Sequence, residues 1–305
     1  MRLLAYLSLG LFILGAGASS RGSWPCPEPE EIAPCICIAE ETGDINMDCS
    51  EVQSDEELSR AFRANFPFSD LNKFTMIKSL SENKIGVTRL SAATFGNVSF
   101  TNIAISHTTL NAVEDMAFSK SFEILEVLIV TYSELTFFPF DILKNCPKLR
   151  DLRVFNNQIT HMSNIHSDSL EYLQVSHNPE LHFNDDTFQT APNLKDLLIN
   201  TVDLQYIAPG TFAALKNLEI LDLSDNKITS LVPDSLRFTS PRRRISLCLT
   251  TTQYVVTVIS SGLLALQHTW RSWERKQVVM MEHLLMIHLS GISSFNIALD
   301  TPARD

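Results

Sequence analysis

The stretch NLEILDLSDNKI, residues 217–228, decides the fold. An amphipathic helix repeats its apolar residues every three to four positions, and a half-buried strand alternates them strictly. This stretch does neither, because its apolar steps are three, two and five residues long. It reads L-x-x-L-x-L-x-x-N-x-I, with apolar residues and an inserted asparagine at Leu218, Leu221, Leu223, Asn226 and Ile228.

The same pattern occurs in seven copies, several of them degraded. Steps of 29, 25, 24, 21, 24 and 24 residues separate the second apolar positions, which are Phe74, Ile103, Leu128, Leu152, Leu173, Leu197 and Leu221. Asn157 and Asn178 repeat the asparagine, while Ser133 and Val202 take its place in two other copies. Self-similarity at 20–29 residues indicates a stack of small, identical structural units.

The pattern resembles that of the leucine-rich repeat family. The resemblance implies an α/β fold, a curved right-handed solenoid with a parallel sheet on its concave face, here of about seven repeats over residues 71–236. The L-x-L alternation predicts a short strand, and the asparagine can hydrogen-bond the backbone where the chain leaves it. A second apolar cluster should close each coil on the convex side: Ala117, Phe118, Phe138, Leu143, Phe188, Phe212 and Leu236. An ordinary α/β domain with leucine-rich strands is the alternative, and the regular steps disfavour it.

The first 18 residues read as a signal peptide. They hold one arginine, an apolar run over residues 3–14 and small residues at 16–18, where cleavage would occur. The run is too short to span a membrane, although an uncleaved signal anchor is the alternative. We therefore expect a secreted, extracellular protein that folds in an oxidising compartment.

Four cysteines, Cys26, Cys35, Cys37 and Cys49, crowd into residues 26–49. A stacked solenoid leaves its first coil bare, so a stapled cap is expected there. Spacing alone allows three disulfide connectivities. Zinc is the competing interpretation, but the C-x-C spacing suits a tetrahedral site poorly. The layout resembles the N-terminal cap of extracellular leucine-rich repeat proteins, which implies the pairs Cys26–Cys37 and Cys35–Cys49.

Residues 50–70 should form a short helix and a connector that cover the first coil. Ser54 and Glu57 form a capping box, and Pro67 limits the run. An apolar stripe follows the capping box at Leu58, Ala61 and Phe62.

Further on, Asn97 opens the chain's N-x-S/T sequon and is predicted to be glycosylated, with an unused sequon as the alternative.

Composition excludes several functions. The 305 residues carry a net charge of −11, with −15 over residues 1–236, so we expect no nucleic acid partner. The sequence contains no phosphate loop, dinucleotide fingerprint, zinc-protease helix or nucleophile elbow, so we expect no cofactor and no catalytic residues.

Histidines and acids gather between residues 161 and 186. Two pairs lie five residues apart along the chain, His161 with His166 and His177 with His182, near Asp185 and Asp186. A metal site is conceivable, but His177 falls in a turn position away from the others. We predict no metal site here.

After Leu236 the repeat is lost, and residues 237–305 form an atypical tail with a net charge of +4. Residues 247–266 lack charge and reach the length of a membrane span, although their polar residues make the hydropathy marginal. A tail packed on the last coil and an aberrant end of a longer array are the alternatives.

We expect Cys146 to be buried and not to pair with Cys248, because their coils are too far apart.

Residues flanking the inner apolar positions should point out from the concave face, because side chains alternate along a strand. Apolar and aromatic residues gather there on neighbouring coils, where a solvated sheet would be mostly polar. Such clusters mark protein interfaces. The predicted partner-binding residues are Val127, Ile129, Arg153, Phe155, Tyr172, Gln174 and Leu198.

The cap, the acidic helix and the FPF stretch at 66–68 resemble a narrower group, crustacean secreted proteins typified by the non-catalytic subunit of shrimp luciferase. That resemblance covers roughly residues 24–236. It implies a non-catalytic accessory protein or scaffold that binds a partner protein, such as a small secreted catalytic subunit. A membrane-tethered receptor ectodomain of the Toll-like class is the alternative, and an enzyme is a distant third.

Overall fold

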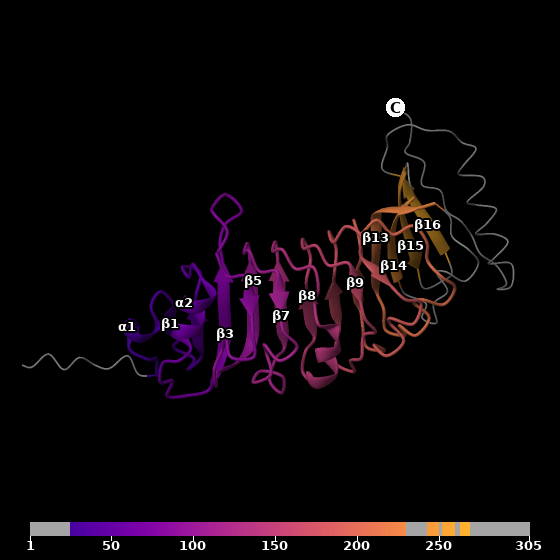
Figure 1. Cartoon of the computed structure of the whole chain (residues 1–305). Helices are drawn as coiled ribbons and strands as arrows, with labels where there is room; N and C mark the ends of the chain where they lie inside the picture. Colours follow the sequence, from indigo (N-terminus) through magenta and orange to yellow (C-terminus); the bar gives the residue numbers. More distant parts are fainter. Residues whose placement is uncertain (1–24, 230–242, 250–251, 260–262, 269–305) are drawn as a thin grey trace, which may run out of the picture.

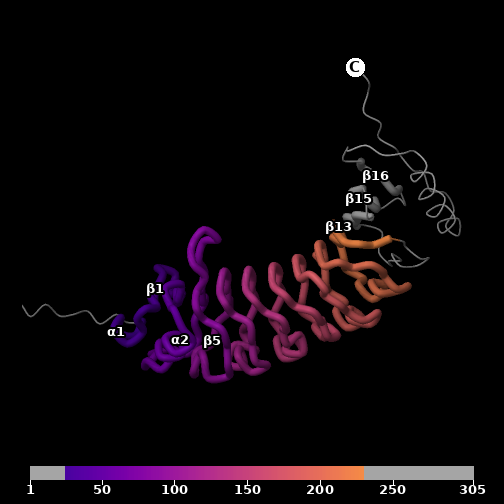
Figure 2. The backbone as a smooth tube through the Cα atoms, turned by 45° about the horizontal axis from the view of Figure 1, so that its top comes forward, coloured from indigo at the N-terminus to yellow at the C-terminus, as the bar shows by residue number. Residues whose placement is uncertain are grey.

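The computed structural model describes residues 25–229, 243–249, 252–259 and 263–268. Within them the chain winds into a solenoid whose strands lie side by side in one long sheet (Figure 1). Figure 2 shows the coils as a curved row that runs from the N-terminal cap to β13. The predicted solenoid with a parallel sheet is confirmed.

The long sheet has twelve strands. In spatial order they are β1 (Ile36–Ala39), β2 (Ile45–Asp48), β3 (Asp70–Ile77), β5 (Ser99–Ser106), β7 (Val127–Thr131), β8 (Asp151–Arg153), β10 (Tyr172–Gln174), β12 (Asp196–Leu198), β13 (Ile220–Ile228), β14 (Arg243–Leu249), β15 (Thr252–Ile259) and β16 (Leu263–His268). Pairing is parallel from β2 to β14 and antiparallel at both ends.

Shorter elements complete the coils. Two small parallel sheets join β4 (Arg89–Leu90) to β6 (Ala112–Val113) and β9 (His161–Met162) to β11 (His182–Phe183). A 3-10 helix, η1, spans Phe140–Asn145. Two α-helices lie in the N-terminal region, α1 (Pro29–Ile32) and α2 (Asp55–Ala61).

The strand register follows the repeat. Each second apolar residue pairs with its counterpart on the next coil, in the unbroken series Phe74, Ile103, Leu128, Leu152, Leu173, Leu197 and Leu221. All seven side chains are buried. On the convex side, six members of the predicted second cluster are buried, while Leu236 lies outside the described residues.

The asparagine of the repeat hydrogen-bonds backbone groups where the chain leaves the strand, as predicted. Asn178 is fully buried, and its Nδ2 donates to the carbonyl oxygens of Val154 (3.0 Å) and Val175 (2.8 Å). Its Oδ1 accepts from the backbone N–H of Ile159 (2.9 Å). One side chain thus joins two coils, because it satisfies backbone groups on both.

The residue before this position is left-handed on six successive coils. The six residues, with φ between 49° and 60°, are His107, Tyr132, Asn156, His177, Thr201 and Asp225. Side chains with a Cβ resist this conformation, and β-branched ones resist it most. Histidine, asparagine and aspartate tolerate it best and occupy four of the six positions, so the turn is unfavourable for the local sequence at Tyr132 and Thr201, where inter-coil backbone hydrogen bonds hold it.

The cap contains both predicted disulfides, Cys26–Cys37 and Cys35–Cys49. The zinc interpretation of these four cysteines is therefore wrong. The cap's β2 continues the solenoid sheet, since Met47 pairs with Phe74.

Helix α2 begins as predicted. The N-cap Ser54 Oγ accepts from the N–H of Glu57, whose carboxylate accepts in turn from the N–H of Gln53 (2.7 Å). The helix ends at Ala61, well before Pro67.

Phenylalanine rings join this helix to the first coils. Phe62 contacts Phe66, Phe74, Phe95 and Phe100, with ring centroids 5.2–5.9 Å apart. Such pairs stabilise beyond their area burial by about 0.5–1.5 kcal/mol each.

The longest repeat step, between Phe74 and Ile103, forms a loop that projects beside β3 (Figure 1). Leu80 in this loop is 61% exposed. The surplus residues therefore leave the stacked coils in register.

The repeat does not stop where the sequence pattern stops. Beyond residue 236, β14 pairs in parallel with β13, and Ile245 lies opposite Leu221 after another 24-residue step. Arginine occupies position 242, where the earlier copies have an apolar residue, which hides the strand from pattern matching. The uncharged run 247–266 falls on β14, β15, β16 and residues outside the described ranges. No helix in the described part of the chain is both long and apolar enough to cross a bilayer.

Candidate functional site on the concave sheet

The predicted binding residues come together on adjacent strands. Val127 and Ile129 lie on β7, Arg153 on β8, Tyr172 and Gln174 on β10, Leu198 on β12, and Phe155 two residues after β8. Ile129, Arg153, Gln174 and Leu198 form one row across four strands. All seven side chains are partly buried. Since the residues between them face the core, these seven line the opposite, outward face.

Arg153 is the centre of this surface. Its Nε and one terminal nitrogen donate to the two carboxylate oxygens of Asp151, at 2.9 and 2.7 Å. Its guanidinium carbon lies 4.5 Å from the centroid of the Tyr172 ring on the next strand. The hydrogen bond to Asp151 raises the pKa of Arg153 further, so the group stays charged.

Tyr172 is fixed at both ends. Arg153 covers its ring, and its hydroxyl donates to Oε1 of Gln174 (3.2 Å). Burial raises the pKa of Tyr172, which keeps the phenol protonated. A rigid aromatic residue presented in this way contributes contact area at little entropic cost.

Phe155 extends the surface toward the turns. Its ring lies 5.5 Å from that of Tyr132, edge to face. We did not predict a role for Tyr132 from the sequence. The repeat count would have found it, because it occupies the left-handed position one coil before Asn156.

Acidic residues rim the cluster and were also missed. Asp151, Tyr172, Asp196 and Ile220 share one row, and Asp222 follows Leu198 in the next. Burial raises the pKa of Asp196, and the nearby Glu219 raises it further. Ile220 is 38% exposed and extends the apolar part of the surface.

A ladder of alternating charge follows the edge of the sheet where the strands begin. It consists of Glu126, Arg150, Glu171, Lys195 and Glu219, one residue per coil, joined through backbone hydrogen bonds. Lys195 Nζ lies 2.7 Å from Glu171, and this hydrogen bond lowers the pKa of Glu171. A shallow hollow of about 510 Å³ lies beside Arg150, Glu171 and Lys195.

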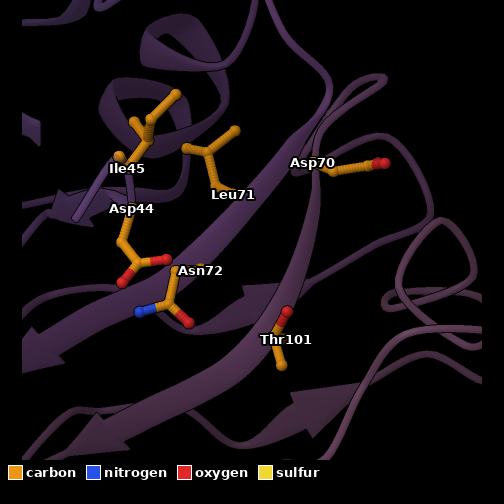
Figure 3. Close-up of a pocket in the computed structure, with 7 residues that line it drawn as sticks. Asp44, Ile45, Asp70, Leu71, Asn72 and Thr101 are labelled. Atoms are coloured by element: carbon orange, nitrogen blue, oxygen red, sulfur yellow. The ribbon is translucent and has the colours of Figure 1, made fainter.

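A second hollow, of about 200 Å³, lies at the cap end (Figure 3). Asp44, Asn72 and Thr101 line it, together with Ile45, Asp70 and Leu71. Asn72 is already engaged, because its amide donates to Asn46 Oδ1 (3.3 Å) and its own Oδ1 accepts from Asn102.

The structure pairs the histidines differently from the sequence analysis, which paired residues that lie five apart along the chain. His161 pairs across coils with His182, and not with His166. Within the described ranges, no group of three or more histidine, cysteine or acidic residues could hold a metal ion. Cys146 is buried and makes no disulfide, as predicted. The side chain of Cys248 is not among those that the structure describes.

The predicted glycosylation site lies on the surface. Asn97 is exposed and follows Gly96, whose φ of 54° turns the chain between coils. Ser99 of the same sequon is buried and donates to the carbonyl oxygen of Ser69 (3.2 Å). The predicted signal peptide at 1–18 lies outside the described residues.

Comparison with known proteins gives a family match, two relatives and one similar solved structure. The sequence model described as "Leucine rich repeat" matches residues 168–228 and 192–239. The chain is 35% identical over 207 residues to the Oplophorus-luciferin 2-monooxygenase non-catalytic subunit of Oplophorus gracilirostris, an alignment that covers 68% of this chain and 56% of that protein. It is 28% identical over 175 residues to the transforming growth factor beta activator LRRC33 of Danio rerio, covering 53% of this chain and 25% of that protein.

The chain thus spans about half the length of the first of these relatives and a quarter of the second. Among solved structures, human 5T4 (trophoblast glycoprotein) superposes with a TM-score of 0.48 at 15% identity, covering 74% of this chain and 81% of that one.

Proposed function

The chain is a leucine-rich repeat protein, and on that premise we propose that it is a secreted, non-catalytic protein that binds a partner protein on its concave face. The observation that carries the proposal is the cluster formed by the fixed pair of Arg153 and Tyr172 on neighbouring strands, with Phe155 on the same outward face. Arginine and tyrosine dominate the energetically important positions of protein interfaces.

The composition of the surface supports a protein ligand. Apolar side chains of Val127, Ile129 and Leu198 flank the cluster, and acidic groups rim it. Aromatic residues and arginine are enriched in protein interfaces, whose rims are polar. Asp196 and Asp222 favour a partner that brings basic groups to the rim.

The similarity to a non-catalytic luciferase subunit supports an accessory role. We propose that the partner is a small secreted catalytic subunit and that this chain carries no chemistry of its own. The two cap disulfides support an extracellular location, because such bonds persist in oxidising compartments.

The test is capture of the partner from the native secretion with immobilised wild-type chain and with the double variant Phe155→Ala/Tyr172→Ala. We expect the wild type to retain one partner in stoichiometric amount. The double variant should bind it more weakly by about 2 kcal/mol or more, measured by titration calorimetry with the identified protein.

A matched control uses the same two residue types off the concave face. Phe137 and Tyr206 are 54% and 53% exposed and lie beyond the strands. Phe137→Ala/Tyr206→Ala should leave the affinity unchanged. Equal affinity of all three proteins, or equal loss in both double variants, would contradict binding through the concave face.

A further inference from the structure

Two histidines that are distant in sequence meet on neighbouring coils. His161 begins β9 and His182 begins β11, and the two residues are directly paired in a parallel ladder. The N–H of His182 donates to the carbonyl oxygen of Thr160 (2.9 Å). Each histidine comes nine residues after its coil's second apolar position, Leu152 or Leu173, so the repeat itself brings them together.

Both imidazoles point away from the core. His161 and His182 are exposed, whereas the residue after each, Met162 or Phe183, packs inward. Side chains of directly paired residues on parallel strands project to the same side, and their strands lie about 4.8 Å apart. In the part of the chain that the structure describes, neither ring makes a hydrogen bond, an ion pair or a ring contact. Their nitrogen atoms are therefore available to a ligand.

We propose that His161 and His182 together bind a divalent transition-metal ion of the zinc and copper class. Imidazole nitrogen is a preferred ligand of both metals. A zinc–nitrogen bond is about 2.0–2.1 Å long, so two rings about 4.8 Å apart at the backbone can reach one ion between them. A metal held in this way links two adjacent coils.

The site leaves coordination positions open. In the same column one coil earlier, Phe137 is exposed, and its ring cannot ligate a metal. No third histidine, cysteine or acidic side chain completes the group among the described residues. A tetrahedral ion would keep two positions for water or for a donor group of another molecule. We therefore expect reversible binding, weaker than that of a closed structural zinc site.

The experiment is calorimetric titration of the full chain with zinc chloride, and separately with copper(II) chloride. We compare the wild type with His161→Asn and His182→Asn, and use His166→Asn and His177→Asn as controls. Both control residues are exposed histidines on the same two coils. We expect either site variant to lose one binding event or to bind at least tenfold more weakly, and the controls to match the wild type. The comparison of variants matters because histidines also occur beyond residue 229.

Chemical protection provides a second readout that needs no substitution. Diethylpyrocarbonate modifies accessible imidazoles, and zinc should slow its reaction with His161 and His182 together, while His177 reacts at an unchanged rate. Peptide mass spectrometry gives the three rates. Unchanged stoichiometry and affinity in both site variants, or zinc that protects neither residue, would overturn the proposal. The concave binding surface is separate, so its test and this one can fail independently.

Discussion

The guanidinium of Arg153 lies over the ring of Tyr172, with its central carbon 4.5 Å from the ring centroid, so that a cation on one coil covers an aromatic face on the next. The same guanidinium donates hydrogen bonds to both carboxylate oxygens of Asp151. This geometry fixes two long side chains that would otherwise lose conformational freedom on binding. A surface already ordered in this way binds with a smaller entropic cost.

Replacing Arg153 should weaken the fold only modestly. Its side chain is 37% exposed, so the ion pair contributes little and the ring contact contributes about 0.5–1 kcal/mol. We expect Arg153→Ala to lower the free energy of unfolding in urea by roughly 1 kcal/mol, and Arg153→Lys to recover less than half of that because lysine lacks the planar fork. Arg63→Ala, which removes a more exposed ion pair, should change it by less than about 0.5 kcal/mol. Full recovery with lysine would show that charge alone matters.

Replacing Asn178 should be costly. The side chain is fully buried and satisfies carbonyl oxygens on two coils and the N–H of Ile159. The variant would leave the N–H of Ile159 and the carbonyl oxygen of Val175 without this partner, although Asn157 would still donate to the carbonyl oxygen of Val154 (3.1 Å). We therefore expect Asn178→Ala to lower the free energy of unfolding by about 3 kcal/mol. Asn193→Ala is the control, since Asn193 also donates to a neighbouring coil, at the carbonyl oxygen of Asp168, but is exposed. Equal losses in the two variants, measured by urea unfolding, would contradict this account.

Thr201 offers a stabilising substitution. Its φ of 56° is unfavourable for a β-branched residue, and Asn156 occupies the same position two coils earlier. We expect Thr201→Asn to raise the free energy of unfolding by about 0.5–1 kcal/mol, because asparagine tolerates this conformation. The reciprocal variant, Asn156→Thr, should lower it by a similar amount. Changes of the same sign in both variants would show that side-chain contacts, and not backbone strain, decide the outcome.

Cys146 should be chemically silent in the folded protein. It is fully buried, and burial, with a smaller contribution from Glu123, raises its pKa to about 12. The reactive thiolate is therefore scarce at pH 8 as well as inaccessible. We expect iodoacetamide to leave the Cys146 peptide unlabelled in the native protein and to label it fully in guanidinium chloride. Rapid labelling of the native protein would mean that this coil opens locally.

The repeat made most of the fold predictable. A fixed step of about 24 residues, together with the alternation around Leu221, is enough to place each strand, its register and its outward-facing residues. The cap pairing of Cys26 with Cys37 was implied by family resemblance, because spacing alone allowed three arrangements. The strand at Ile245 was missed because Arg242 replaces the first apolar residue of the repeat and Thr250 replaces the asparagine.

The candidate site was only partly predictable for a different reason. Strand alternation identifies Arg153 and Tyr172 as outward-facing, but their stacking depends on rotamers that no sequence pattern encodes. The His161–His182 pair was missed because distances were counted along the chain. In a solenoid the relevant distance is counted across coils, one repeat step at a time.

The phenylalanine cluster around Phe62 has a consequence for how the protein is made. It joins helix α2 to the first two coils, and all of its rings lie before residue 101. During synthesis the N-terminal part of a chain leaves the ribosome first. We expect the cap and first coils to form a template on which each later coil docks as it emerges. Ribosome-stalled chains that end near residue 170 should then already resist protease over residues 25–119, and digestion of that region would contradict this order of assembly.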